Sequence, residues 1–263
     1  MDYDSSRFVF VYSMNFEDRV NINFYCYLWR LSRKLVSSRP MISKEKAFIF
    51  IHNFKTGGTS IEKKLGHFNT LEADVQDHRT LRDIERLTER SFYFRKGLYA
   101  LKIGKPNSAY RFLKTAAFPE LTKTEYESFY KFTFVRNTWA RLYSWYANIM
   151  KDERMRRKFN ITDEGLSYED FLLTKVNHQT FSQLHFITDS KGAVPMDFIG
   201  RFETLQQDFD TVCEHLNISD STLPKLLVRK YGHYTENYTD VTKDLVYSLY
   251  KDEIDYFNFE FGD

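Results

Sequence analysis

The chain has 263 residues, of which 42% are hydrophobic and 17% aromatic, a content that excludes a disordered chain and suffices for the core of one α/β domain. The 38 basic and 36 acidic residues leave a formal net charge of +2, which excludes general nucleic-acid binding driven by charge. The two cysteines, Cys26 and Cys213, show neither metal-ligand spacing nor a disulfide framework, so cysteine usage favours a reducing compartment.

The first 45 residues are predicted to be an N-terminal extension of a domain that spans residues 46–263. We expect a short strand over 8–12 and an amphipathic helix over 20–36, where polar residues interrupt the aromatic ones. This helix is expected to pack on the domain, with contact to a membrane surface as the alternative. No stretch approaches the ~18 unbroken apolar residues of a spanning helix, and the acidic start lacks the form of a signal peptide.

A strand rich in β-formers is predicted over 47–52, and a helix over 59–66. Between them stands Lys55-Thr56-Gly57-Gly58-Thr59-Ser60. A glycine turn between a strand and a helix suits a phosphate, because backbone N–H groups and the helix N-terminus point at the anion and a lysine adds full charge. The alternative is an ordinary turn with a surface lysine. In the triphosphate-binding P-loop the lysine follows the second glycine, so a site with the lysine first need not hold a triphosphate with magnesium.

The remaining predicted elements alternate between helices and strands, which argues for a parallel sheet with helices on both faces. They are a helix over 79–90, a strand over 97–103, a helix over 123–130, a strand over 132–135, a helix over 138–150 continued by a charged run over 151–158, and helices over 204–216 and 241–254. Thr204 and Gln207 have the spacing of a capping box, and Cys213 falls on the apolar face of that helix.

A second candidate phosphate contact follows the predicted strand over 132–135. Arg136 stands at its C-terminal end, and Ser144 lies two helical turns further on. Open α/β sheets bind ligands at this edge, and the planar fork of an arginine suits bidentate phosphate contact. The alternative is that Arg136 pairs with a carboxylate and Ser144 is a neutral helix residue.

Together these segments resemble the sulfotransferases that use PAPS (3′-phosphoadenosine 5′-phosphosulfate), most closely the carbohydrate and heparan-type branch and its bacterial relatives. The family signature His-x-Pro-Lys-Thr-Gly-Gly-Thr-Ser is matched by residues 52–60, His-Asn-Phe-Lys-Thr-Gly-Gly-Thr-Ser. The signature Phe-Val-Arg-Asn-Pro-Trp is matched by residues 134–139, Phe-Val-Arg-Asn-Thr-Trp. Gly-Arg-Phe-Glu at 200–203 matches a third segment, and the likeness covers about residues 46–262. Phe54 and Thr138 replace the family's prolines, so we expect both turns to be less restrained.

The resemblance implies a P-loop-like three-layer α/β fold and a PAPS donor that leaves as adenosine 3′,5′-bisphosphate, without a metal. Lys55 would meet the bridging oxygen on which charge grows as the bisphosphate leaves. The main-chain N–H groups of Thr56, Gly57, Gly58, Thr59 and Ser60 would hold the 5′-phosphate. Arg136 and Ser144 would hold the 3′-phosphate. Arg229 and Lys230 correspond loosely to basic residues near that phosphate, and a solvated basic pair is the alternative.

An acceptor hydroxyl also needs a base, and His78 at the start of a predicted helix is the first candidate. His52 is the second, although its ring is expected to pack beside the lysine turn and shape it. Glu62 is the third. The alternative for His78 is an exposed polar residue at a helix N-terminus.

The predicted function is sulfuryl transfer from PAPS to a hydroxyl acceptor, expected to be a carbohydrate. The alternatives are a P-loop-type phosphotransferase on a small metabolite and an inactive nucleotide-binding relative. We expect no nucleic-acid partner, no membrane span and a cytoplasmic location, with the Golgi lumen as the alternative. The sequence does not define the oligomeric state.

Overall fold

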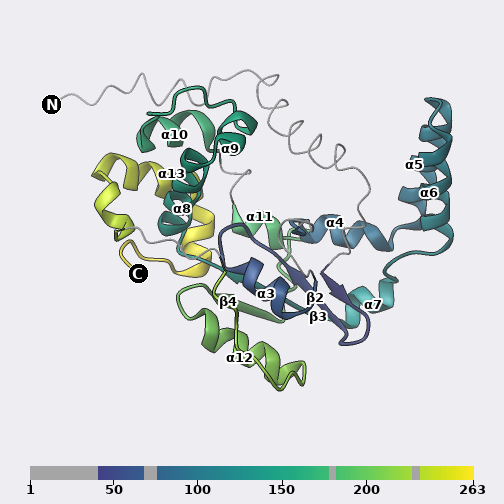
Figure 1. Cartoon of the computed structure of the whole chain (residues 1–263). Helices are drawn as coiled ribbons and strands as arrows, with labels where there is room; N and C mark the ends of the chain where they lie inside the picture. Colours follow the sequence, from purple (N-terminus) through teal and green to yellow (C-terminus); the bar gives the residue numbers. More distant parts are fainter. Residues whose placement is uncertain (1–40, 68–75, 178–181, 227–231) are drawn as a thin grey trace. The chain divides into compact units, whose positions relative to one another are not determined.

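The computed structural model describes residues 41–67, 76–177, 182–226 and 232–263 (Figure 1). The elements predicted over 8–12 and 20–36 lie outside the described residues, as do Cys26, Arg229 and Lys230. The chain divides into two compact units. Residues 39–136 and 183–228 form what we call the sheet unit, and residues 137–182 and 229–263 belong to the helical unit.

Among its described residues, the sheet unit contains four strands in the order β1-β2-β3-β4. β1 (Ile42–Ser43) pairs antiparallel with β2 (Phe48–Ile51), whereas β3 (Tyr130–Val135) runs parallel to β2, and β4 (Phe198–Arg201) runs parallel to β3. The strands predicted over 47–52 and 132–135 are confirmed as β2 and β3. The fold is the expected α/β arrangement, with a mostly parallel sheet flanked by helices.

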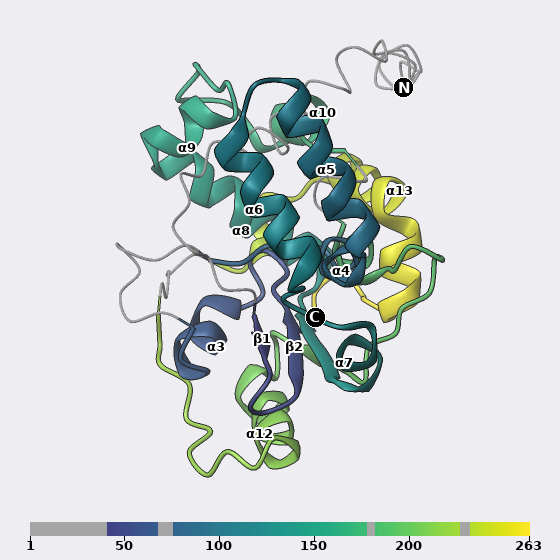
Figure 2. The same cartoon turned by 90° about the vertical axis from the view of Figure 1, so that its right-hand side faces the viewer.

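One face of this sheet forms an aromatic core against α3 (Gly58–Lys64) and α12 (Leu205–His215), which Figure 2 shows beside the strands. The rings of Phe50 and Phe132 stack with centroids 5.0 Å apart. Cys213 is buried in the same cluster, as predicted. The alternate residues Ile49, Ile51, Thr133 and Val135, which point to the other face, are buried as well. Burial on both faces is typical of parallel sheets.

The sheet unit contains further helices between β2 and β4. They are α4 (Leu81–Glu85), η1 (Arg86–Thr88), α5 (Arg90–Lys102), α6 (Pro106–Ala117), α7 (Lys123–Ser128) and α11 (Gln183–Ile187). The helices predicted over 79–90 and 123–130 are confirmed as α4 with η1 and as α7.

The strand predicted over 97–103 is wrong, because this segment is the second half of α5. Gly97 reduces intrinsic helix propensity, but it permits close packing of α6. A Cβ at Gly97 would lie 2.7 Å from Leu113 Cγ.

The capping box predicted at the start of α12 is also wrong. The Thr204 side chain makes no cap hydrogen bond. Its hydroxyl instead donates to Asp208 Oδ2 at 2.8 Å, and the same oxygen accepts a hydrogen bond from the backbone N–H of Arg201 at 2.6 Å. Asp208 therefore connects the end of β4 to α12.

The helical unit contains α8 (Thr138–Lys151), α9 (Glu153–Lys158), α10 (Tyr168–Lys175), η2 (Tyr234–Asn237) and α13 (Asp240–Phe257). The predicted continuation of α8 through 151–158 is wrong, because Asp152 has extended backbone and its carboxylate caps α9. A buried ion pair between Arg141 and Glu253, 3.4 Å apart, joins α8 to α13. In the described part of the chain, no helix is both long and apolar enough to cross a membrane.

Candidate active site

The turn between β2 and α3 is shaped by two residues with left-handed backbone, Lys55 (φ 66°) and Gly57 (φ 79°). Glycine adopts this conformation without penalty, whereas a lysine there is strained by about 1 kcal/mol. Non-glycine residues in such conformations cluster at functional sites. The strained backbone of Lys55 therefore indicates that the surrounding structure holds this residue in place.

The two glycines are needed for different reasons. A Cβ at Gly57 would lie 2.6 Å from Leu205 Cδ2, on the first turn of α12. A Cβ at Gly58 would lie 2.1 Å from His52 Cδ2, well inside contact distance. The His52 ring therefore packs directly on the backbone of the turn, which is the shaping role expected for it.

Asn53 ties the turn to the neighbouring strand. Its side-chain amide donates to Thr133 Oγ1 at 3.1 Å and to the Phe134 carbonyl at 3.2 Å. The Thr56 hydroxyl donates back to the Asn53 carbonyl at 2.9 Å. Sequence reasoning missed Asn53, because its partners lie 80 residues away along the chain.

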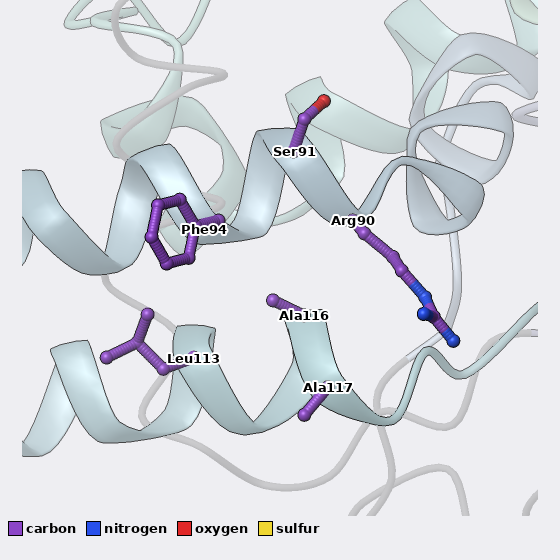
Figure 3. Close-up of a pocket in the computed structure, with 6 residues that line it drawn as sticks. All are labelled: Arg90, Ser91, Phe94, Leu113, Ala116 and Ala117. Carbon is purple, nitrogen blue, oxygen red and sulfur yellow. The ribbon is translucent and has the colours of Figure 1, made fainter.

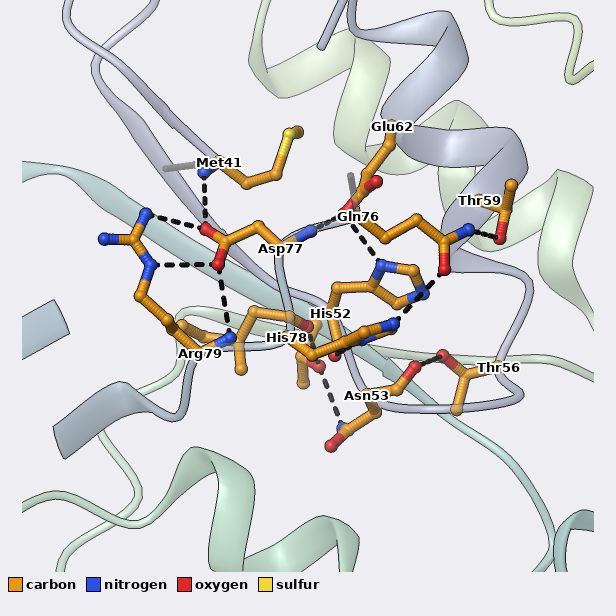
Figure 4. A network of polar contacts seen from close by, with 12 residues as sticks. Met41, His52, Asn53, Thr56, Thr59, Glu62, Gln76, Asp77, His78 and Arg79 are labelled. Carbon is orange, nitrogen blue, oxygen red and sulfur yellow. Dashed lines mark hydrogen bonds and ion pairs between the residues drawn. The ribbon is translucent and has the colours of Figure 1, made fainter. Parts of the chain in front are cut away.

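His52 and Glu62 form a buried pair beneath the turn, with 2.8 Å between Nδ1 and Oε1 (Figure 4). Burial lowers the pKa of His52 to about 3 and raises the pKa of Glu62 to about 7. Because burial disfavours charge on both side chains, this contact is a hydrogen bond from neutral imidazole and not an ion pair. Glu62 also accepts a hydrogen bond from the Asp77 N–H at 3.2 Å.

His78 lies against the same pair, with its ring centroid 4.3 Å from that of His52. Nδ1 is 3.1 Å from the His52 carbonyl oxygen, and Nε2 is 3.2 Å from Gln76 Oε1. A carbonyl only accepts, so neutral His78 carries its proton on Nδ1 and its lone pair on Nε2. If the oxygen and nitrogen of the Gln76 side-chain amide are exchanged, the amide N–H group donates to Nε2 of His78.

His78 does not have the ordinary pKa of a histidine. Burial, with a smaller contribution from neighbouring His52, lowers the pKa of His78 to about 3. The ring of Phe54 stacks on His78 with centroids 3.9 Å apart, and Phe186 packs edge-on against Phe54 at 5.3 Å. His78 is therefore neutral at physiological pH, with its basic nitrogen directed at Gln76, which in turn hydrogen-bonds Thr59 on α3.

A carboxylate–arginine pair fixes the segment that carries His78. Arg79 donates to both oxygens of Asp77 at 2.9 Å, and Asp77 Oδ2 also accepts the Met41 N–H at 3.0 Å. Burial opposes ionisation, but Arg79 and these hydrogen bonds hold the pKa of Asp77 below its usual range. The ionised pair anchors His78 on one side while Phe54 covers it on the other.

Arg136 follows β3 and meets the lysine turn. Its Nη1 lies 3.5 Å from the Lys55 carbonyl oxygen, and its guanidinium carbon lies 4.2 Å from the centre of the Phe202 ring. Gln183 holds the backbone of Arg136 with two amide contacts, accepting from its N–H at 2.8 Å and donating to its carbonyl at 2.9 Å. The carboxyl ends of β2 and β3 thus bring Lys55 and Arg136 together.

Phe202 belongs to the Gly-Arg-Phe-Glu segment. Packing explains why the first residue of this segment, Gly200, is a glycine. A Cβ at Gly200 would lie 2.5 Å from a ring carbon of Phe134 on β3. Sequence reasoning found this segment only as a match and missed its contact with Arg136. It missed Gln183 entirely, because nothing near Gln183 signals a role.

The other predicted phosphate contacts divide between the two units. Ser144 lies on α8 in the helical unit and is 3% exposed, while Arg229 and Lys230 lie outside the described residues. Thr56 and Ser60 are buried in the turn, and the Ser60 N–H donates to the Gly57 carbonyl at 3.0 Å. Among the described residues, no cluster of three or more His, Cys, Asp or Glu side chains is arranged to hold a metal ion.

A mostly parallel α/β sheet with a glycine turn after one strand and an arginine after the next defines a P-loop-like protein. Residues 39–260 match the family model described as "Sulfotransferase family", which covers most of the chain. The chain therefore belongs to the sulfotransferase family. Comparisons with individual curated proteins and with solved structures gave no match.

Proposed function

We propose that this chain transfers the sulfuryl group of PAPS to a hydroxyl group of a carbohydrate. The observation that carries the proposal is the approach of two cationic residues at the ends of adjacent parallel strands. Arg136 Nη1 lies 3.5 Å from the Lys55 carbonyl oxygen. A donor with two separate phosphates, at the 5′ and 3′ positions of one ribose, fits two adjacent but distinct cations.

In the proposed reaction the acceptor oxygen attacks sulfur in line, and the bond from sulfur to the bridging oxygen breaks. Adenosine 3′,5′-bisphosphate leaves with the electron pair of that bond. The Lys55 ammonium stabilises the charge that develops on the leaving oxygen, and the N–H groups of the turn hold the 5′-phosphate. Arg136 and Ser144 hold the 3′-phosphate, with Arg229 and Lys230 as further candidates.

His78 is the proposed base and takes the hydroxyl proton on Nε2. It is half-buried, whereas His52 is 2% exposed and Glu62 is fully buried. A bulky acceptor reaches the partly exposed His78 side chain more readily than a carboxylate under the turn. In this arrangement His52 and Glu62 support the position of His78, through the His52 carbonyl and the contact between the two rings.

The experiment that tests the proposal measures transfer of label from sulfur-labelled PAPS to a fractionated extract of carbohydrate acceptors. We expect labelled product in the wild type and about a thousandfold slower labelling with Lys55→Ala. Calorimetry with adenosine 3′,5′-bisphosphate and with ATP separates this function from a phosphotransferase, which would prefer ATP. Binding of the bisphosphate without turnover on any fraction would favour an inactive nucleotide-binding relative.

A further inference from the structure

The helical hairpin formed by α5 and α6, with the residue that follows it, differs in charge from the rest of the chain. Residues 90–118 contain seven of the 38 basic residues and none of the 36 acidic residues. The rest of the chain therefore carries a formal net charge of −5, although the whole chain carries +2. We call this segment the basic hairpin.

The two helices of the basic hairpin pack mainly on each other through small residues. Gly97, Ala100 and Ala109 are its buried positions, and Gly97 lies directly under the Leu113 side chain. Such a thin contact buries little apolar surface, and helices of this length are marginal in water without packing on one face. The hairpin thus leaves most of its own apolar side chains uncovered.

The uncovered side chains are large and apolar. Seven of the ten large hydrophobic residues that are exposed in the described part of the chain belong to the basic hairpin. These are Phe94, Leu98, Tyr99, Leu101, Ile103, Tyr110 and Phe118. At the turn between the helices, Leu101 and Ile103 are 51% and 44% exposed and alternate with the exposed Lys102. Exposed apolar surface gathered in one segment marks an interaction site.

A groove of about 460 Å³ runs between the helices of the basic hairpin (Figure 3). Phe94 on α5 and Leu113 on α6 face each other across it, with Ala116 further along the wall. The Arg90 guanidinium lies at one end. Like the turn between α5 and α6, the groove combines an apolar surface with a neighbouring cation.

We propose that the basic hairpin binds the surface of an anionic phospholipid bilayer. Basic residues attract the headgroups, while Leu101, Ile103 and the aromatic side chains enter the boundary with the acyl chains. Pairing with the same hairpin of a second copy fits poorly, because two segments that each carry seven positive charges repel each other. An acidic polysaccharide satisfies the cations but leaves the aliphatic side chains at the turn in water.

The test measures flotation of the full-length protein with lipid vesicles. One set is phosphatidylcholine alone, and the other contains about a third phosphatidylserine. The charge variant is Lys102→Glu/Lys105→Glu, and its matched control is Lys191→Glu/Lys225→Glu, two exposed lysines elsewhere in the sheet unit. The apolar variant is Leu101→Ser/Ile103→Ser. Circular dichroism and binding of adenosine bisphosphate check that each variant folds.

We expect the wild type to bind only the vesicles with phosphatidylserine, and to be released by salt. The charge variant should bind at least about thirtyfold more weakly, because each lysine close to an anionic surface strengthens binding about fivefold. The apolar variant should also bind more weakly, and the control should match the wild type. Absence of wild-type binding, or equal loss in the control, overturns the proposal. So does binding to heparin alone, or a dimer that the apolar variant dissociates.

Discussion

The turns after β2 and β3 occupy equivalent places at the ends of adjacent parallel strands, yet they are built differently. The turn after β2 is a strained loop in which the His52 ring sits on Gly58 and Lys55 has left-handed backbone. The turn after β3 leads directly into α8, with the Asn137 side chain capping the helix. The contacts of the first turn fix a loop that contains a lysine. The contacts of the second turn fix an arginine just before a helix.

Both turns lack the proline of the family signature, and each replaces it with a different contact. The Phe54 ring stacks on His78, so its contribution is apolar. Thr138 is the first residue of α8, is fully buried, and donates its hydroxyl to Glu253 Oε1 at 2.7 Å. Restraint that proline supplies through φ is thus supplied here by side chains. No local sequence pattern reveals these contacts, and the expectation of less restrained turns stays a prediction.

The largest effect is expected at the lysine of the first turn. Lys55→Ala should lower turnover by about 10³, the upper range for removing one stabiliser of transition-state charge, and should also weaken adenosine bisphosphate binding, because its ammonium is the cation beside the 5′-phosphate. Lys55→Gly removes the same ammonium but also relieves the left-handed strain, so it should lose as much turnover and gain about 1 kcal/mol of stability. Lys46→Ala, an exposed lysine, is the control. Steady-state kinetics that leave Lys55→Ala near wild-type turnover would remove the lysine from the chemistry.

The next effect concerns the base beside that turn. His78→Ala should lower turnover by about 10², with donor affinity unchanged. Because burial lowers the pKa of His78 to about 3, the basic form is present throughout the neutral range. Turnover should therefore not change with pH between about 5 and 7. A rise through pH 7 that Glu62→Gln abolishes would assign the base to Glu62.

The buried pair under the first turn predicts a pH-dependent stability. The pKa of Glu62 is about 7 in the folded state, above its usual 4.5, so folding favours the neutral carboxyl. The Glu62 carboxyl should contribute a loss of about 3 kcal/mol of unfolding free energy as pH rises from 4.5 to 7, against the opposite contribution of the buried neutral histidines His52 and His78. Glu62→Gln does not titrate, so its stability relative to the wild type should increase over the same range. Urea unfolding at several pH values measures the difference, and a constant difference would place an ionised Glu62 under the turn.

The second turn should respond to loss of one hydroxyl. Thr138→Val keeps the volume but removes the hydrogen bond to Glu253, which also pairs with Arg141. We expect a loss of about 2 kcal/mol in unfolding free energy, since a buried acceptor loses a donor. Thr138→Pro should lose less, because proline fits the first helical position and stiffens the unfolded chain. Equal stability of Thr138→Val and wild type would show that the hydroxyl does not restrain this turn.

The smallest effect is expected for the ring in the first turn. Phe54→Pro restores the family residue and removes the stacking on His78, at a cost of about 1 kcal/mol. Solvent then reaches the imidazole, so the pKa of His78 should rise towards 6.5, which NMR titration measures directly. An unchanged pKa would mean that Phe54 does not shield the ring.

Strong local signals made part of this molecule predictable. The apolar runs over 47–52 and 132–135 identified β2 and β3, because buried parallel strands are continuous hydrophobic segments. β4 escaped prediction, since a strand that contains Gly200 and Arg201 depends on its pairing with β3. The segment after Gly97 looked like a strand, but it belongs to α5, where Gly97 lies against Leu113 of α6. Long-range packing decided each of these cases.

The candidate site divides in the same way. Lys55, the two glycines and Arg136 stand in short motifs, so they can be identified from the sequence. Gln183 and Phe202 support Arg136 from 47 and 66 positions away, and no periodicity connects them to it. The same is true of the low pKa of His78, which arises from rings that folding brings together. Sequence predicts the groups that carry charge, and the fold determines their protonation and support.

The most direct test of the account is a calorimetric titration with adenosine 3′,5′-bisphosphate and with AMP. If Arg136 contacts the 3′-phosphate, the wild type should bind the bisphosphate far more tightly than AMP. Arg136→Ala should lose about 3 kcal/mol of bisphosphate binding through the missing charge-assisted contact, and its AMP affinity should stay unchanged. Arg136→Lys keeps the charge without the planar fork and should fall between the two. Equal wild-type affinities for AMP and the bisphosphate would contradict the account.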